Sequence, residues 1–227
     1  MTLIYLVRHG ETDWNRARRI QGSTDIPLND TGRGQAARSG RLLARQPWDG
    51  IASSPLSRAF ETGVIIAQAV GIDPTGIETL DALVERRYGE AEGLDDRELL
   101  RLFPGDSPVP GRERRAEVAA RVIPALVALA ERYELERRAG SPDARLIVTT
   151  HGGVIRTVLN HVSPLTKYDR GIPITNGSVH SFRHVDGAIE LVLFNDPIDI
   201  ESVTGDCDDF DEQNAVEQRE VRSDPRT

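Results

Sequence analysis

Two histidines in this sequence each follow a short apolar run and each precede a glycine. The letters RHG at residues 8–10 follow the run 3–7, and HGG at residues 151–153 follows the run 145–150. Apolar runs of this length are typical of strands buried on both faces of a parallel sheet. Such sheets bind ligands at the carboxyl ends of their strands. If the two strands are neighbours, both histidines border one ligand pocket.

Two arginines indicate that the ligand is an anion. Arg8 ends a strand in which no Lys or Asp precedes it, so its charge at the rim of the core needs a counterion. Arg58 lies in the first turn of the helix expected after a strand at residues 49–53, which puts it at the same end of the sheet. Two guanidinium groups in one place favour phosphate, because each pairs bidentately with phosphate oxygens. The glycine beside each histidine allows the backbone to approach that ligand closely.

The elements that hold these residues alternate between strands and helices. Strands are predicted at residues 3–7, 49–53, 145–150, 179–185 and 188–194, and helices at residues 34–46, 113–138 and 154–161. A further helix runs to Val70, with Ser54 as its N-cap and Pro55 in its first turn, and Pro124 should kink the longest helix. Asp186-Gly187 joins the last two strands as a hairpin. This order predicts an α/β domain whose mostly parallel sheet has an antiparallel edge.

Composition narrows the class of protein. The chain has 227 residues, is 38% hydrophobic and 28% charged, and carries a net charge of -8. Negative charge with only 5% aromatic residues argues against nucleic acid and membrane surfaces as partners. The single cysteine, Cys207, excludes an internal disulfide and a cysteine metal cluster. With no signal-like start and no membrane-length apolar run, we expect a cytoplasmic protein.

The charge pattern also divides the chain. We predict one folded domain over residues 1–202 and an acidic C-terminal tail over residues 203–227, with eight acidic residues against three arginines. Such a tail has little apolar surface to offset the entropy of ordering, so we expect it to be flexible.

Five sequence blocks, taken together, resemble the histidine phosphatase superfamily, in its phosphoglycerate mutase-like branch. The blocks are YLVRHGETDWN at residues 5–15, RIQGSTDIPLNDTGRGQA at 19–36, SSPLSRAFETG at 53–63, LVERRYGEAEGL at 83–94 and LIVTTHGGVIR at 146–156. They appear in the family's order and span most of the chain up to about Phe194. The resemblance implies a three-layer α/β/α fold around the sheet.

The resemblance also implies roles for individual residues. His9 would be the nucleophile that becomes a phosphohistidine, and Glu85 would be the proton donor. Arg8, Arg58 and His151 would hold the phosphoryl oxygens. Further substrate-binding positions implied by the match are Asn15, Gln21, Gly22, Arg86, Tyr88 and Gly152.

The chemistry supports these roles independently. Phosphomonoester hydrolysis needs acceleration of up to ~10²¹-fold, whereas one general acid supplies about 10² to 10⁴. Most of the effect must therefore come from positive charge arranged around the transferred group. Arg8, Arg58 and a protonated His151 would provide it without a metal, and the sequence predicts neither metal nor cofactor. His9 must present an unprotonated nitrogen, so its other nitrogen should donate to a backbone carbonyl.

The sequence favours a metal-independent phosphomonoesterase acting through a phosphohistidine on a small phosphorylated metabolite. The alternative is a cofactor-dependent phosphoglycerate mutase, which needs extra positive charge and an enclosing lid. Residues 94–111 form a short segment without lysine, although Arg97, Arg101 and the pair at 114–115 could substitute. Residues 171–182 resemble the phosphatase branch. A non-catalytic phospho-ligand binding protein would be expected to lack His9, Glu85 or His151.

The natural substrate and the choice between monomer and homodimer stay open at this point. Selectivity in relatives resides in variable loops such as residues 95–112.

Overall fold

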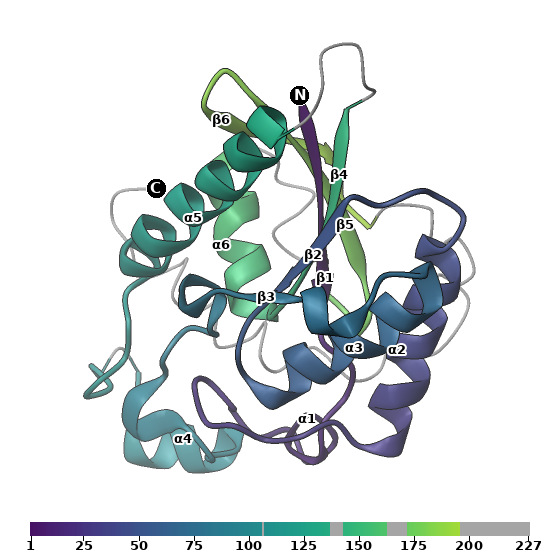
Figure 1. The fold of residues 1–227 in the computed structure, drawn as a ribbon. Helices are drawn as coiled ribbons and strands as arrows, with labels where there is room; N and C mark the ends of the chain where they lie inside the picture. Colours follow the sequence, from purple (N-terminus) through teal and green to yellow (C-terminus); the bar gives the residue numbers. More distant parts are fainter. Residues whose placement is uncertain (106, 137–142, 163–171, 196–227) are drawn as a thin grey trace.

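The structure, a computed structural model, describes residues 1–105, 107–136, 143–162 and 172–195 (Figure 1). The strands are β1 Thr2–Arg8, β2 Gly50–Ser53, β3 Glu78–Thr79, β4 Ala144–Thr150, β5 Val179–Val185 and β6 Ala188–Leu193. The α-helices are α1 Asp13–Arg16, α2 Asp30–Leu43, α3 Ser57–Val70, α4 Asp96–Leu102, α5 Arg115–Glu136 and α6 Gly152–Val162. Short 3-10 helices are η1 Pro74–Gly76, η2 Asp81–Leu83 and η3 Gly89–Ala91.

The sheet has the predicted mixed topology. Its six strands lie in the order β3-β2-β4-β1-β5-β6. The strands β3, β2, β4 and β1 pair in parallel, whereas β5 pairs antiparallel with both β1 and β6. The expected α/β class with an antiparallel edge is therefore confirmed.

Helices cover both faces of the sheet, as the three-layer expectation required (Figure 1). On one face, α5 and α6 pack Val122, Leu126 and Val158 against Ile4 and Leu146 of the central strands. The other face is covered by α2 and α3 through a second apolar cluster, which contains Val7, Leu43, Ile51, Ile66, Ala67, Ile147 and Val179. The two central strands are thus buried on both sides, which explains their nearly unbroken apolar runs.

A third apolar cluster lies apart from the two sheet faces. It joins Ile20, Tyr88, Ala91, Leu99 and Val109, and so gathers α4 and the loops around η3. Figure 1 shows α1 and α4 at the end of the sheet opposite the N-terminus, where β1 ends.

The predicted hairpin is confirmed. Asp186 and Gly187 have φ angles of 50° and 78°. Positive φ at both central residues belongs to a type I′ turn, whose twist matches that of the flanking strands.

The start of α3 differs from the prediction. Its N-cap residue is Leu56, not Ser54, and Leu56 makes no side-chain cap. The cap is supplied from a distant loop, because the Asp25 carboxylate accepts hydrogen bonds from the backbone N and the hydroxyl of Ser57 at 2.8 and 2.7 Å. The Ser54 hydroxyl instead contacts His151, as described below.

Other boundaries moved by a few residues. Asn29 caps α2, so this helix begins at Asp30. Gly32 and Gly34 lie in its first turns, and glycine is unfavourable in helices, so its start was not predicted. Helix α5 begins at Arg115 and leaves Glu113 outside it, with Pro124 within it. The short elements β3 and α4 were not predicted. The acidic tail lies outside the described residues, and the boundary at residue 202 stays a prediction.

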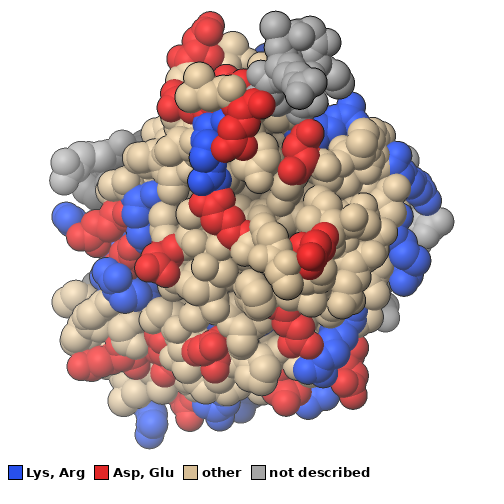
Figure 2. Space-filling view, viewed as in Figure 1, with Lys and Arg blue, Asp and Glu red and all other residues tan. Residues whose placement is uncertain are grey.

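The surface in Figure 2 shows mixed charge. On this face, and among the residues described, Lys and Arg side chains lie among Asp and Glu side chains and form no continuous basic patch. Within the same residues, no helix is long and apolar enough to cross a membrane.

Candidate active site

The sheet register brings the two histidines together. Strands β1 and β4 are adjacent and parallel, and Arg8 pairs with Thr150, so each strand ends directly before its histidine. The rings of His9 and His151 are 5.2 Å apart between centroids, with an interplanar angle of 60°. The predicted meeting of both histidines at one sheet end is confirmed.

His9 has the tautomer expected of a nucleophile. Its Nδ1 lies 2.7 Å from the carbonyl oxygen of Gly10. Because a carbonyl only accepts, Nδ1 carries the proton and Nε2 keeps its lone pair. Burial, with the charges of Arg58 and Arg8, holds the pKa of His9 well below 6.5. At neutral pH the ring is therefore uncharged, with Nε2 able to attack.

His151 is also neutral in the unliganded structure, whereas the sequence leads us to expect a protonated ring around the transferred phosphoryl group. Its side chain is fully buried, and burial followed by the charge of Arg58 holds the His151 pKa well below 6.5. Its Nε2 lies 2.8 Å from the Ser54 hydroxyl, and its buried Nδ1 has no hydrogen-bond partner within the described residues. A neutral His151 can still donate one hydrogen bond to a ligand oxygen.

Two arginines bring positive charge to the histidines. Arg58 is fully buried, and its terminal nitrogens donate to the carbonyls of Thr24 at 2.8 Å and Gly22 at 2.7 Å. Burial lowers the pKa of Arg58 to about 10, so it stays charged at neutral pH. Arg8 is 3% exposed and donates to the carbonyl of Ile174 at 2.5 Å. Both charges are therefore fixed in place by backbone carbonyls.

Glu85 is anchored beside this group. It is 5% exposed, and its carboxylate accepts hydrogen bonds from the backbone N of Gly153 at 3.0 Å and of Arg86 at 2.8 Å. A Cβ on Gly153 would lie 2.6 Å from a Glu85 carboxylate oxygen, so only glycine leaves room for that contact. Glu85 thus lies against the start of α6. Its contact there, Gly153, is the second residue after His151.

The predicted turn at Gly22 supports Arg58. Gly22 has a φ of 54°, and its carbonyl accepts from Arg58 as noted. The Glu92 carboxylate accepts from the backbone nitrogens of Ser23 and Thr24, each at 3.0 Å. Sequence reasoning assigned no role to Glu92, although it lies inside a quoted block, because its contacts with Ser23 and Thr24 span 68 residues or more.

The remaining predicted residues have structural partners. Asn15 and Thr12 form the capping box of α1, and Gln21 accepts from the Thr12 hydroxyl at 2.8 Å. The Arg86 guanidinium lies 5.3 Å from the centre of the Tyr88 ring. A Cβ on Gly152 would lie 3.4 Å from Nε of Arg8, so Gly152 borders the arginine. Their contacts with substrate stay predictions.

Gly10 is needed for packing. A Cβ there would lie 2.2 Å from the carbonyl oxygen of Gly32, and a Cβ on Gly32 would lie 2.1 Å from that of Glu11. The two backbones therefore touch where α2 begins. Gly10 thus allows close approach of another segment of the chain. The predicted close approach of a ligand beside it stays a prediction.

Two further side chains hold the histidines, and sequence reasoning missed both. Asn176 donates from Nδ2 to the carbonyl of His9 at 2.8 Å, and Ser54 contacts His151 as described. Both residues lie inside blocks whose resemblance was recognised. Among the described residues, no group of three or more His, Cys, Asp or Glu side chains is placed to hold a metal ion.

Comparison with known proteins identifies the family. The model of the histidine phosphatase superfamily (branch 1) matches residues 4–197. The chain belongs to this superfamily. The matched residues include the five sequence blocks and the histidines that follow β1 and β4.

Relatives of this superfamily have different names. An uncharacterized phosphatase, PhoE, of Bacillus subtilis (strain 168) is 37% identical over 163 residues, which cover 72% of this chain and 78% of that protein. Phosphoglycerate mutase-like protein 4 of Arabidopsis thaliana is 37% identical over 196 residues, covering 81% of this chain and 80% of that protein. The structure of a mycobacterial glucosyl-3-phosphoglycerate phosphatase with VO3 matches with a TM-score of 0.76 and 26% identity, covering 86% of this chain and 99% of that one.

Proposed function

We propose that this protein is a metal-independent phosphomonoesterase that acts through a phosphohistidine at His9 on a small phosphorylated metabolite. One observation carries the proposal. Nδ1 of His9 donates to the Gly10 carbonyl, which leaves Nε2 unprotonated beside His151 and near two buried guanidinium groups. A nucleophile among fixed cations suits an incoming phosphoryl group.

The reaction has two steps. First, Nε2 of His9 forms a bond to phosphorus while the bond from phosphorus to the leaving oxygen breaks, and Glu85 gives its proton to that oxygen. Second, a water oxygen attacks phosphorus, its proton passes to Glu85, and the bond from nitrogen to phosphorus breaks. The products are an alcohol and inorganic phosphate, and His9 and Glu85 return to their starting forms.

The other residues hold the phosphoryl oxygens during both steps. Arg8 and Arg58 supply fixed positive charge, and the unpartnered Nδ1 of His151 supplies a hydrogen bond. An approaching phosphate dianion also favours protonation of His151, since opposite charge raises the pKa of a histidine. The bound substrate thus restores the third positive charge that the unliganded site lacks.

The short segment between η3 and α5 favours hydrolysis over the mutase reaction. In its described part this segment forms α4 and contributes Leu99 and Val109 to the third cluster, rather than extending as a long lid. Since the described part of this segment forms no enclosing lid, water would reach the phosphohistidine and a bisphosphorylated intermediate would be poorly retained. The mutase reaction is the second candidate, because a relative carries the name phosphoglycerate mutase-like protein.

The test is phosphate release by His9→Ala, with His161→Ala as the matched control, since His161 is exposed at the end of α6. We expect His9→Ala to lose aryl phosphatase activity and acid-labile phosphate labelling, while His161→Ala keeps both. Chelator should leave the wild-type rate unchanged. Retained labelling in His9→Ala would contradict the nucleophile assignment. Faster interconversion of phosphoglycerates than phosphate release would assign the mutase reaction instead.

A further inference from the structure

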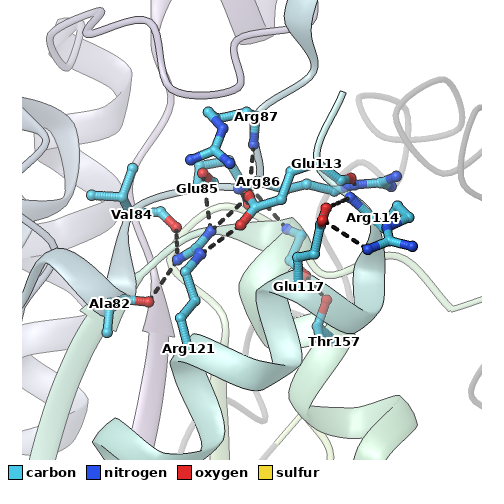
Figure 3. A network of polar contacts seen from close by, with 11 residues as sticks. Ala82, Val84, Glu85, Arg86, Arg87, Glu113, Arg114, Glu117, Arg121 and Thr157 are labelled. Carbon is cyan, nitrogen blue, oxygen red and sulfur yellow. Dashed lines mark hydrogen bonds and ion pairs between the residues drawn. The ribbon is translucent and has the colours of Figure 1, made fainter. Parts of the chain in front are cut away.

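An ion pair between a buried glutamate and a partly buried arginine lies behind Glu85. Glu113 is 3% exposed, just before α5, and Arg121 lies two turns along that helix. Nε and a terminal nitrogen of Arg121 lie 2.8 and 3.1 Å from the two Glu113 carboxylate oxygens, which is a bidentate pair (Figure 3). Such a fork fixes both orientation and distance.

The rest of the Arg121 guanidinium binds the segment that carries Glu85. It donates to the carbonyls of Ala82 at 2.6 Å, Val84 at 2.7 Å and Glu85 at 3.4 Å. Figure 3 shows these carbonyls converging on Arg121 from one side while Glu113 meets it from the other. One side chain thus ties three backbone groups of residues 82–85 to α5.

Glu113 binds the same segment on its other side. Its carboxylate accepts from the backbone N of Arg87 at 3.1 Å, and its backbone N donates to the Arg87 carbonyl at 2.9 Å. Its carbonyl accepts from Nε of Arg86 at 2.7 Å. Residues 82–87 are therefore held at both ends by one ion pair.

The charge state of Glu113 supports this arrangement. Burial alone would raise the pKa of Glu113, but hydrogen bonds from Arg121 and from the backbone of Arg87, with their charges, lower it overall. Glu113 is thus ionised at neutral pH and keeps both oxygens as acceptors.

We propose that Glu113 and Arg121 are positioning residues that fix the backbone of residues 82–87 and so aim the Glu85 carboxyl at the leaving oxygen. The inference rests on the proposed function, in which Glu85 transfers the proton. The Glu85 carboxylate contacts Gly153 on α6 and its own neighbour Arg86. The backbone that carries this carboxylate is held on the α5 side by Arg121 and Glu113.

The test compares two carboxylates near the start of α5. Glu113→Gln keeps the side-chain volume but turns one acceptor into an NH₂ group, which must face a donor of Arg121 or Arg87. The control is Glu117→Gln, because Glu117 forms an exposed pair with Arg114 at 3.0 Å. The readout is kcat/KM for an aryl phosphate, whose leaving group needs little protonation, and for an alkyl phosphate, which needs more.

We expect Glu113→Gln to lose alkyl phosphatase activity about tenfold more than aryl phosphatase activity, because a misplaced general acid forfeits part of its 10²- to 10⁴-fold effect. Phosphohistidine should also accumulate during aryl phosphate turnover, since Glu85 activates the water in the second step. Glu117→Gln should leave both ratios unchanged. Equal losses on the two substrates would overturn the proposal, since a merely destabilised protein loses both alike.

A second variant keeps the test decisive if Glu113→Gln folds poorly. Arg121→Lys retains the positive charge near His151 but cannot bridge three carbonyls and a carboxylate. We expect the same shift toward aryl substrates, and an unchanged substrate ratio would contradict the proposal. Glu85→Gln separates the two levels of inference. If Glu85→Gln loses aryl and alkyl phosphatase activity equally, the proton-donor role of Glu85 fails. If Glu85→Gln loses more alkyl phosphatase activity but the Glu113 and Arg121 variants do not, only the positioning role fails.

Discussion

Strand β1 carries polar clusters at both of its ends, and the two clusters balance charge differently. At the carboxyl end, the terminal nitrogens of Arg58 donate to backbone carbonyl oxygens, and its Nε has no hydrogen-bond partner within the described residues. At the amino end, the Glu134 carboxylate lies 3.1 Å from the Thr2 hydroxyl, 3.0 Å from Nδ1 of His184 and 3.7 Å from the N-terminal ammonium group.

The difference separates stability from function. The amino-end cluster surrounds a carboxylate with hydrogen-bond donors, so it ties β1, α5 and β5 together without needing a ligand. The carboxyl-end cluster holds buried positive charge through hydrogen bonds to neutral carbonyls, and the carboxylates of Glu85, Asp25 and Glu92 stabilise that charge electrostatically. Burying the charge still costs free energy that an incoming anion offsets. The first cluster should therefore affect unfolding and the second should affect turnover.

The largest effect should come from Arg58→Met. Removing one fixed cation from the transferring phosphoryl group should lower kcat/KM for an aryl phosphate about 10²- to 10³-fold, as loss of one preorganised donor does elsewhere. Steady-state kinetics on wild type and variant measure this. A loss under about tenfold would mean that Arg58 serves packing rather than phosphoryl binding.

Ligand-dependent stability should give the next largest effect. Inorganic phosphate or vanadate at about 100 times its Kd should stabilise the wild-type protein by about 2.7 kcal/mol, because it binds only the folded state. Thermal unfolding with and without ligand measures the shift in Tm. Arg58→Met should lose most of it, and an undiminished shift in this variant would place the anion elsewhere.

At the opposite end, Glu134→Gln should reduce stability without changing turnover. Hydrogen bonds to Thr2 and His184 and the approach of the N-terminus depend on that charge, so we expect a loss of about 2 kcal/mol in the free energy of unfolding. Urea titration and aryl phosphatase assays measure the two quantities. A fall in kcat/KM of the folded variant would show that the two ends of β1 are coupled.

The sequence predicted what local pattern and strand pairing determine. Apolar runs that end at His9 and His151 predicted two strands whose histidines meet if the strands are neighbours, and the parallel pairing of β1 with β4 brings the two rings together. What it could not predict depends on contacts between distant segments. Asp25 caps α3 from 32 residues away, so the helix begins later than the predicted N-cap Ser54 implied. The lowered pKa of His151 in the unliganded site could not be predicted for a similar reason, because complete burial and nearby guanidiniums exist only in the folded chain.

The last effect is confined to acidic pH and concerns His180, four residues before His184 on β5. His180 has neutral partners, with Nε2 at 2.9 Å from the Ser178 hydroxyl and Nδ1 accepting from the backbone N of Asn195 at 3.2 Å. Burial, helped by the charge of Arg156, lowers the pKa of His180 to about 3. Between about pH 3 and 6.5 the unfolded chain therefore binds a proton that the native state does not, so stability rises with pH over this range and levels off above it.

Replacing His180 should remove that dependence. Between about pH 4 and 6, His180→Gln should lower the slope of unfolding free energy against pH by up to about 1.4 kcal/mol per pH unit. The reason is that one proton is no longer taken up on unfolding. Denaturant titrations at several pH values measure the slope, with exposed His161→Ala as the control that keeps the wild-type slope. An unchanged slope in His180→Gln would mean that His180 is protonated in the folded protein, and that burial on β5 does not keep it neutral.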